Sequence, residues 1–484
     1  MIARISRGRT AAAAAVGLAF VAIVLANLMV PEPRGPADQG DFTRIFASFS
    51  SGPRGLPLWP APGDPRVEER FFHQYLRHWT YGATSSELAR ATSSHLLFLP
   101  ERIRGWIFGR REFDLAANTF FLVVALGFIL AGALATLTGV VPFLTLSLAA
   151  LVVADLRIAW YLNSFFSEAG ALFFAFVWLC LSLTWWETRS RALLVASLAA
   201  LTLLAATKLP YGPSVLPIAL AMAALVMPLP SRRFFVVAVA TAIGLGTASF
   251  LFFADHRAHT EFDNAFHFVF AGALPRLSPE DRTTFLASIG LDPNLAGAAG
   301  RNAYDPDGPA ANLKVRDPLR GRLHASAAWT LARDHPRAML GLLEDSLAET
   351  GRYDIEGQFG YAWRARDETA SPEPPAFRVW SALRSAWIGG WPAYLGLLVG
   401  LGVVAVRTVG ADAHSWKRFF VALACGCFAG SILQVAIAAI GNGTVDLRKQ
   451  LFLANLLFDF ALVLTAGGAF ADRRAAEARA TAAS

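Results

Sequence analysis

Charged side chains are scarce in this sequence. They make up only 16% of its 484 residues, whereas hydrophobic residues make up 55%. Soluble proteins carry charge on about a quarter of their residues. The apolar residues also gather in runs of about 17–24, the length that crosses the hydrocarbon core of a bilayer as a helix. The composition therefore excludes an ordinary soluble protein and predicts an all-α, polytopic membrane protein.

Cysteine is scarce as well. The three cysteines, Cys180, Cys425 and Cys427, all lie inside apolar runs, where small buried packing residues are expected. The spacing of Cys425 and Cys427 matches neither a zinc site nor a thioredoxin-type site. The polar segments contain no cysteine, so a disulfide framework is excluded there.

Basic residues exceed acidic ones, with a formal net charge of +7 and a pI of about 9.6. In a soluble protein this balance would suggest a nucleic-acid partner. Here the arginines cluster in short loops between apolar runs, as expected of cytoplasmic loops in a membrane protein. We therefore expect no nucleic-acid partner.

The first apolar run, about 10–30, follows three arginines and could be a signal peptide. It is long for one and lacks a clear cleavage site, so we expect an uncleaved first helix. With the later runs this gives about ten transmembrane helices. The later runs lie near 117–137, 139–155, 169–186, 192–207, 212–228, 234–253, 391–407, 418–440 and 450–471.

Charge in the loops orients these helices. If the N-terminus is inside, the segments 187–191, 230–233, 407–418 and the tail from 472 are also inside, and each is basic. An even number of spans then returns the C-terminus to the same side. Because the Ala, Arg and Gly richness suggests a bacterium, we expect the cytoplasmic (inner) membrane, with both termini cytoplasmic.

The same topology divides the chain into three parts. Residues 1–253 form a membrane region of about seven helices, with a first extracytoplasmic loop at 31–116. Residues 254–390 form a mainly helical extracytoplasmic domain, and 391–484 add about three helices and a cytoplasmic tail. Within the domain, one helix is expected to begin at Pro336 and stop near Gly351. Residues 377–387 are expected to form a helix in the membrane interface.

Polar residues that suit chemistry recur at the extracytoplasmic surface. In the first loop, Asp38, Asp41 and Arg44 closely follow the first helix. A carboxylate there can accept a proton from an attacking hydroxyl or hold a divalent cation. The alternative is a solvated turn.

The 155–168 loop joins two spans and contains Arg157, Asn163 and Glu168. Polar groups packed at membrane depth are costly and usually functional, although a helix cap beside an aromatic belt would explain them too. Lys208 interrupts another apolar stretch at the same surface. It could meet a phosphate, or it could be a snorkelling lysine beside a turn.

Near the last span, Arg448 and Lys449 stand on the extracytoplasmic side, against the topological preference. A lipid-linked phosphate would account for them. Asn455 and Asp459 follow on one face of the span. They indicate either a functional site or an interhelical hydrogen bond that only holds the bundle together.

A last group contains His256 with neighbouring acids after the seventh span. Histidine and carboxylates could suggest a metal, but the spacing matches no specific site, and a solvated helix end is favoured. We assign no metal ligand and no certain cofactor, and a divalent cation stays a possibility.

Several short motifs recur along the chain in a fixed order: Gly40-Asp41-Phe42-Thr43-Arg44-Ile45, the run Tyr161–Glu168, Lys208-Leu-Pro210, Asn264–Phe270 with Leu274-Pro275, Leu286–Leu291, His335-Pro336 and Leu447–Asp459. Their order resembles the bacterial GT-C superfamily, most closely the WsfD-type, glycan hexosyltransferase-related membrane proteins. Two motifs depart from the family pattern, with Ser-Glu-Ala at Glu168 in place of Ser-Glu-Pro and Lys-Leu-Pro at Lys208 in place of Lys-Pro-Gln.

The resemblance implies a GT-C-like fold and an enzyme that transfers a hexosyl or pentosyl group from a polyprenyl-phosphate sugar to an extracytoplasmic glycan or glycolipid acceptor, with inversion. In this family the acid of the first loop is the proposed base, which corresponds to Asp41. Lys208, Arg448 and Lys449 would bind the donor phosphate. The other candidates would support the site or the acceptor: Asp38, Arg44, Arg157, Asn163, Glu168, His256 and Asp459.

Two other classes of function remain open. A transporter or flippase of lipid-linked glycans would also need intramembrane polar residues, but such proteins commonly contain internal repeats, and none is evident here. A non-catalytic membrane scaffold for envelope assembly would use the 254–390 domain as its binding module.

Overall fold

A computed structural model describes most of the chain. The described residues are 7–36, 45, 50–53, 75–81, 92–208, 210–226, 257–305, 307–324, 326–353, 359–361, 376–409, 411–412 and 415–483.

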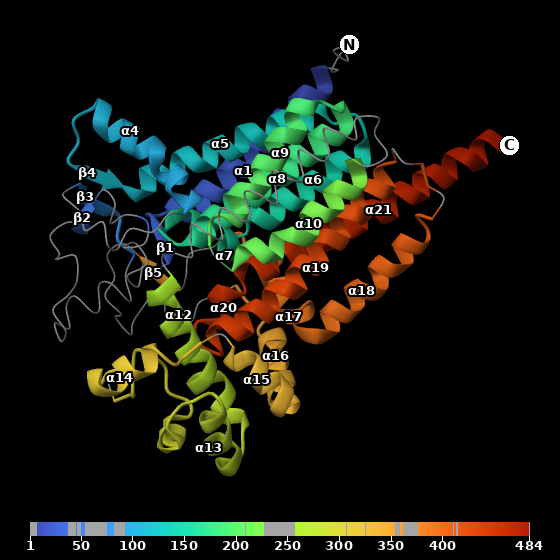
Figure 1. The fold of residues 1–484 in the computed structure, drawn as a ribbon. Helices are drawn as coiled ribbons and strands as arrows, with labels where there is room; N and C mark the ends of the chain where they lie inside the picture. Colours follow the sequence, from blue (N-terminus) through green and yellow to red (C-terminus); the bar gives the residue numbers. More distant parts are fainter. Residues whose placement is uncertain are drawn as a thin grey trace.

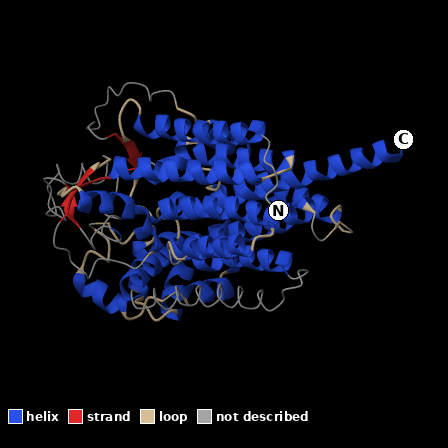
Figure 2. Ribbon diagram, turned by 90° about the horizontal axis from the view of Figure 1, so that it is seen from above, coloured by secondary structure: helices blue, strands red, loops and turns tan. Residues whose placement is uncertain are grey.

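Long apolar helices form the body of the molecule and run side by side (Figures 1 and 2). Their side chains pack into one large hydrophobic core that extends from α1 to α21. Its helices are α1 (Arg7–Met29), α5 (Leu115–Thr136), α6 (Val140–Ala154), α8 (Ser167–Thr188), α9 (Arg191–Ala205), α10 (Tyr211–Val226), α18 (Gly390–Val406), α19 (Trp416–Asn442) and α21 (Phe452–Ala483).

Among the described residues, five helices are long and apolar enough to cross a membrane: α1, α5, α8, α19 and α21, the last over Phe452–Ala471. The number rises to seven if two bent pairs each count as one span. One pair joins α6 to Leu156–Asn163 at 68°, and the other joins α17 (Val379–Trp387) to α18 at 100°. The polytopic membrane fold is therefore confirmed, whereas the full count of about ten stays a prediction.

The three other expected spans account for the difference between seven and ten. Runs 192–207 and 212–228 form α9 and α10, which have only 15 and 16 residues. At 1.5 Å per residue such helices are about 22–24 Å long, shorter than a hydrocarbon core of about 30 Å. The expected span at 234–253 lies outside the described residues.

Strands and short helices gather at one end of the bundle, and the two chain ends lie at the other (Figure 1). The topology prediction likewise requires both termini on one side of the membrane. The side on which they lie stays a prediction. The elements of the first polar segment are β1 (Arg34–Pro36), β2 (Ser50–Pro53), β3 (His78–Tyr81), η2 (Ser93–Phe98), α4 (Leu99–Ile107) and β4 (Glu112–Asp114). Strands β2, β3 and β4 form one antiparallel sheet, and β1 pairs with β5 (Phe359–Tyr361).

A second hydrophobic core lies beside this end and consists of residues within 262–342 together with Ala439 of α19. It is centred on aromatic and leucine side chains such as Phe266, Phe270 and Phe285. The elements in this part of the chain are α12 (Arg257–Phe266), the π-helix η4 (His267–Ala273), η5 (Leu274–Arg276), α13 (Pro279–Ser288), η6 (Pro293–Ala298), α14 (Leu313–Arg320), α15 (Ala327–Asp334) and α16 (Pro336–Ala348).

This second core is held directly against α19. Gly272 and Gly443 come so close that a Cβ on Gly443 would lie 2.6 Å from the carbonyl oxygen of His267. The buried ring of His267 also hydrogen-bonds the Asn442 side chain through Nδ1, at 3.0 Å. Burial lowers the pKa of His267 below its ordinary value, so the ring is neutral at this contact.

Two helices expected in the 254–390 segment are confirmed. Helix α16 begins at Pro336, buries Leu342, and is followed by Gly351 at a φ of 86°. Helix α17 spans Val379–Trp387 and is amphipathic, with Ser381 and Arg384 buried while Trp387 is 83% exposed. Its location in a membrane interface stays a prediction.

Candidate functional site

The loop 155–168 is the point where distant segments meet. Asp155 ends α6 and begins the short helix α7 (Leu156–Ala159), which continues as η3 (Trp160–Asn163). Its carboxylate caps this turn by accepting from the N–H of Arg157 at 3.0 Å. The loop therefore turns sharply within the protein and carries its polar groups into a buried setting.

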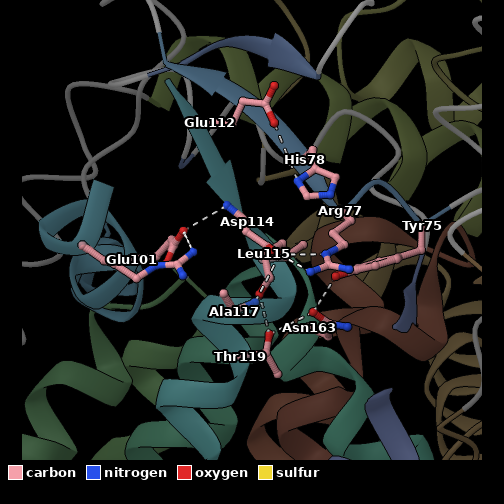
Figure 3. A network of polar contacts seen from close by, with 11 residues as sticks. Tyr75, Arg77, His78, Glu101, Glu112, Asp114, Leu115, Ala117, Thr119 and Asn163 are labelled. Carbon is pink, nitrogen blue, oxygen red and sulfur yellow. Dashed lines mark hydrogen bonds and ion pairs between the residues drawn. The ribbon is translucent and has the colours of Figure 1, made fainter. Parts of the chain in front are cut away.

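Asn163 is fully buried and joins three segments (Figure 3). Its Oδ1 accepts from the hydroxyls of Tyr75 at 2.7 Å and Thr119 at 2.9 Å, and its Nδ2 donates to the carbonyl of Arg34 at 2.8 Å. Asn163 thus ties the first polar segment to the start of α5.

Glu168 and Lys208 form an ion pair, although they come from separate segments. Lys208 Nζ lies 2.9 Å from Glu168 Oε1, and Tyr211 donates its hydroxyl to the same oxygen at 3.2 Å. Glu168 is almost completely buried in the first turn of α8, and the Lys208 side chain is 12% exposed. Glu168 therefore fixes the position of the Lys208 ammonium group.

The two cations before the last span have different surroundings, although α20 (Leu447–Gln450) carries both. Lys449 is buried, and its Nζ lies 4.1 Å from the centre of the Phe166 ring, a cation–π contact with the 155–168 loop. Arg448 instead donates from Nε to Glu349 Oε2 at 2.6 Å. Lys449 therefore belongs to the 155–168 cluster, and Arg448 links the last span to the end of α16.

Asn455 and Asp459 share one face of α21, as expected, and both bind the segment that follows α16. Asn455 accepts from the N–H of Gly351 at 2.8 Å and donates to the carbonyl of Arg352 at 3.1 Å. Asp459 accepts from the Tyr353 hydroxyl and from Trp380 Nε1, the latter at 2.7 Å. These contacts favour the interpretation in which the polar face holds the bundle together.

Asp459 also has a buried cationic partner. Arg384 Nε approaches Asp459 Oδ1 to 2.7 Å, although the two atoms are not aligned as a hydrogen bond, and both side chains are fully buried. The Arg384 guanidinium lies over the Phe458 ring, 4.3 Å from its centre. Together with Trp380, Arg384 anchors helix α17 to the last span.

Two more helices hold the same segment with one buried polar side chain each. Asn27 of α1 accepts from the N–H of Phe377 at 2.9 Å, and Asp155 accepts from the N–H of Ser381 at 2.9 Å. The segment 376–387 therefore lies across the ends of α1, α6 and α21, held by Asn27, Asp155 and Asp459.

The start of α5 is the best-defined charged junction outside the 155–168 loop (Figure 3). Asp114 caps the helix by accepting from the N–H of Ala117 and forms a two-pronged ion pair with Arg77 at 2.9 and 2.7 Å. Burial raises the pKa of Asp114, but the bonds from Arg77 and Ala117 outweigh burial, so its pKa lies below the ordinary 3.8.

This lowered pKa predicts an acid-dependent contribution to stability. The stabilisation by the ionised Asp114 carboxylate is complete above its ordinary pKa of 3.8. It is lost as the pH falls through the lowered pKa of this group in the folded protein. Because Arg77 is partly exposed, we expect Asp114→Asn to cost only about 1 kcal/mol at pH 7. Thermal unfolding of the purified protein between pH 7 and 3 measures this. The difference between the two proteins should shrink as the pH falls below 3.8, and a constant difference would contradict the assignment.

Several expected site residues lie outside the described residues: Asp38, Asp41, Arg44 and His256. Arg157 is described, and its guanidinium lies 5.6 Å from the Trp160 ring, within the same loop. Among the residues that the structure describes, no three His, Cys, Asp or Glu side chains could hold a metal ion together. The divalent cation therefore stays a prediction.

Sequence reasoning did not single out Asn27, Arg34, Tyr75 or Glu349. Asn27 carried a usable signal, because a polar residue inside an apolar run is costly. Tyr75 and Glu349 carried none, since their roles depend on partners more than 80 residues away in the chain. Arg34 is buried to 1% exposure directly after the first helix, where a cation normally reaches water.

The cluster places two ammonium groups beside the 155–168 loop. Lys208 and Lys449 come from separate segments and both contact the 155–168 loop, through Glu168 and Phe166. Partly buried ammonium groups stabilise negative charge more strongly than exposed ones, because the surrounding dielectric is low. A general base for the described site is not evident among these residues, since Glu168 and Asp155 are already engaged.

Comparison with known families gives one match over nearly the whole chain. The family model of the YfdI N-terminal transmembrane domain matches residues 2–482. No curated protein and no solved structure matches the chain.

Proposed function

The chain belongs to the YfdI N-terminal transmembrane domain family, and we propose that it is a membrane glycosyltransferase of the GT-C type. It transfers a sugar from a polyprenyl-phosphate donor to a glycan or glycolipid acceptor at the extracytoplasmic surface. The resemblance of the motifs suggests this chemistry. One observation carries it furthest: the buried loop 155–168 collects Lys208 and Lys449 at the end of the bundle where the first polar segment also packs.

The segment that carries the proposed base is tied to this cluster at its start. Asn163 binds the carbonyl of Arg34, and Asp41, which lies outside the described residues, follows Arg34 by seven positions in the sequence. Ile45, on the other side of Asp41, is buried in the main hydrophobic core. Both anchors support a role for Asp41 near the 155–168 loop.

The reaction is a single displacement that inverts the anomeric carbon. Asp41 accepts the proton of the acceptor hydroxyl as its oxygen bonds to that carbon. The bond from the carbon to the phosphate oxygen breaks, and the electron pair leaves with the polyprenyl phosphate. Lys208, Lys449 and Arg448 stabilise the negative charge that develops there. Glu168 orients Lys208, and Glu349 orients Arg448.

The proposal is tested with purified protein in lipid nanodiscs. The protein receives a series of polyprenyl-phosphate hexoses and pentoses with an envelope-glycan extract as acceptor, and released polyprenyl phosphate is quantified. We expect release with at least one donor, and only when acceptor is present. Intact donors throughout the series would overturn the proposal. A variant in which Lys208 is replaced by methionine should show at least a tenfold lower rate, from the loss of one charge-assisted contact.

A further inference from the structure

Arg34 is a buried cation that the chain itself leaves largely unpaired. Its side chain is 1% exposed, and its Nε donates to the carbonyl of Asn27 near the end of α1. Within the described part of the chain, Nη1 and Nη2 are both buried and neither has a hydrogen-bond partner. A guanidinium without a counter-ion in such a place costs much free energy.

The described carboxylates of the 155–168 loop and of the start of α5 are already engaged with other groups. Asp155 accepts from the N–H groups of Arg157 and Ser381, Asp114 is paired with Arg77, and Glu168 is paired with Lys208. No ion pair of Arg34 is found among the described residues. The other fully buried arginine, Arg384, differs in this respect, because Asp459 lies 2.7 Å from it.

Capping of α1 does not explain this residue. A basic side chain at a helix C-terminus is favourable, and the bond from Nε to Asn27 is such a contact. It uses one of the five N–H groups of the guanidinium. A lysine or an exposed arginine would cap as well without burying two nitrogens that bind nothing.

We propose that Arg34 binds an oxyanion carried by a substrate, through the two outer nitrogens of its guanidinium. These nitrogens form a planar fork that matches two oxygens of a phosphate or carboxylate group. The backbone of Arg34 is fixed on both sides, by Asn163 and by pairing with Tyr361 of β5. The fork is therefore held in place before an anion binds. The proposal depends on the proposed function only for the identity of the substrate.

The test measures oxyanion binding without requiring transfer. Wild type, Arg34→Met and Arg34→Lys are purified in detergent, and thermal unfolding is followed against increasing farnesyl phosphate, inorganic phosphate or glucuronate. Farnesol and glucose serve as uncharged counterparts. Arg110→Met is the matched control, because it removes the same charge from an exposed position outside the site.

We expect the wild type to be stabilised by at least one of the three oxyanions and not by its uncharged counterpart. Arg34→Met should raise the apparent Kd by tenfold or more, Arg34→Lys should fall between, and Arg110→Met should match the wild type. Stabilisation by farnesyl phosphate alone assigns the site to the donor, and stabilisation by glucuronate assigns it to an acidic acceptor. Equal Kd values in wild type and Arg34→Met would overturn the proposal.

The unliganded proteins give a second readout. If the outer nitrogens await a ligand, Arg34→Met should unfold at the same temperature as the wild type or higher, because a buried unpaired charge is removed. If Arg34 serves only as a structural cap, Arg34→Met should unfold at a lower temperature than the wild type. The oxyanions should then have the same effect on both proteins, and this result would overturn the proposal. Arg34-dependent binding without any sugar transfer would instead contradict the proposed function and leave this inference standing.

Discussion

Sugar transfer by the Asp41→Asn variant is expected to be about 100- to 10,000-fold slower than by the wild type, the usual contribution of a general base. Asparagine has nearly the same shape as aspartate but cannot accept the proton of the acceptor hydroxyl. The loss should therefore appear in kcat, with donor binding retained. Initial rates of polyprenyl phosphate release at saturating donor measure this effect.

Asp38→Asn is the matched control for this experiment, because it changes the same chemical group three residues earlier. Asp38 lies outside the Gly-Asp-Phe pattern that carries the resemblance, so its loss should be several-fold at most. Both variants should elute and unfold as the wild type does. If Asp38→Asn were inactive and Asp41→Asn active, the base would have to be reassigned. Full activity in both would exclude general-base catalysis by Asp38 and Asp41.

Breaking the ion pair between Arg384 and Asp459 is expected to be the most destabilising single change in the described part of the chain. Both side chains are fully buried, and Asp459 also receives hydrogen bonds from Trp380 and Tyr353. Removing either partner leaves an uncompensated charge in the protein interior, at a cost of about 3–5 kcal/mol. Arg384→Met and Asp459→Leu should therefore each lower the unfolding temperature of the purified protein sharply.

The double variant Arg384→Met/Asp459→Leu distinguishes the cost of an unpaired buried charge from the cost of lost side-chain packing. When both charges are removed together, no buried charge remains without a partner, and such replacements are often neutral or stabilising. We expect the double variant to be more stable than either single variant. Additive losses would show instead that each side chain stabilises the protein independently.

Asp41→Asn and the variants of the Arg384–Asp459 pair test different properties of the protein. Asp41 belongs to the proposed chemistry, whereas Arg384 and Asp459 hold segment 376–387 across the helix ends beside the 155–168 loop. A loss of activity in Arg384→Met would follow from displaced supporting residues. In Arg384→Met, we then expect oxyanion binding through Arg34 to weaken together with the stability of the protein.

Hydropathy predicted the bundle well because long apolar runs have few alternatives to a transmembrane helix. It was weaker where the chain bends. The run at 139–155 forms a helix with the expected bounds, Val140–Ala154, but this helix has only 15 residues, and the chain bends by 68° at Asp155 before the next short helices. That turn is stabilised by a bond to Ser381, more than 200 residues away, which no local pattern reveals.

The candidate site was partly predictable for a similar reason. The positions of Glu168, Lys208 and Lys449 on one side of the membrane followed from the topology, and the structure brings them to the same loop. Their partners were not predictable, since an ion pair such as that of Arg448 with Glu349 depends on how the end of α16 packs against the last span. Arg34 was missed because burial of a guanidinium after the first helix runs against the expectation that such a side chain reaches water.

Cleavage of the bond between a sugar and a polyprenyl phosphate is the step on which the proposed function depends. It is tested with proteoliposomes that contain a donor with one isotope in the sugar and another in the phosphate. We expect the labels to separate, with the sugar label in the acceptor and the phosphate label in free polyprenyl phosphate, and we expect Asp41→Asn to keep them together. If the wild type moved the doubly labelled lipid between leaflets with both labels still joined, the protein would be a flippase and not a glycosyltransferase.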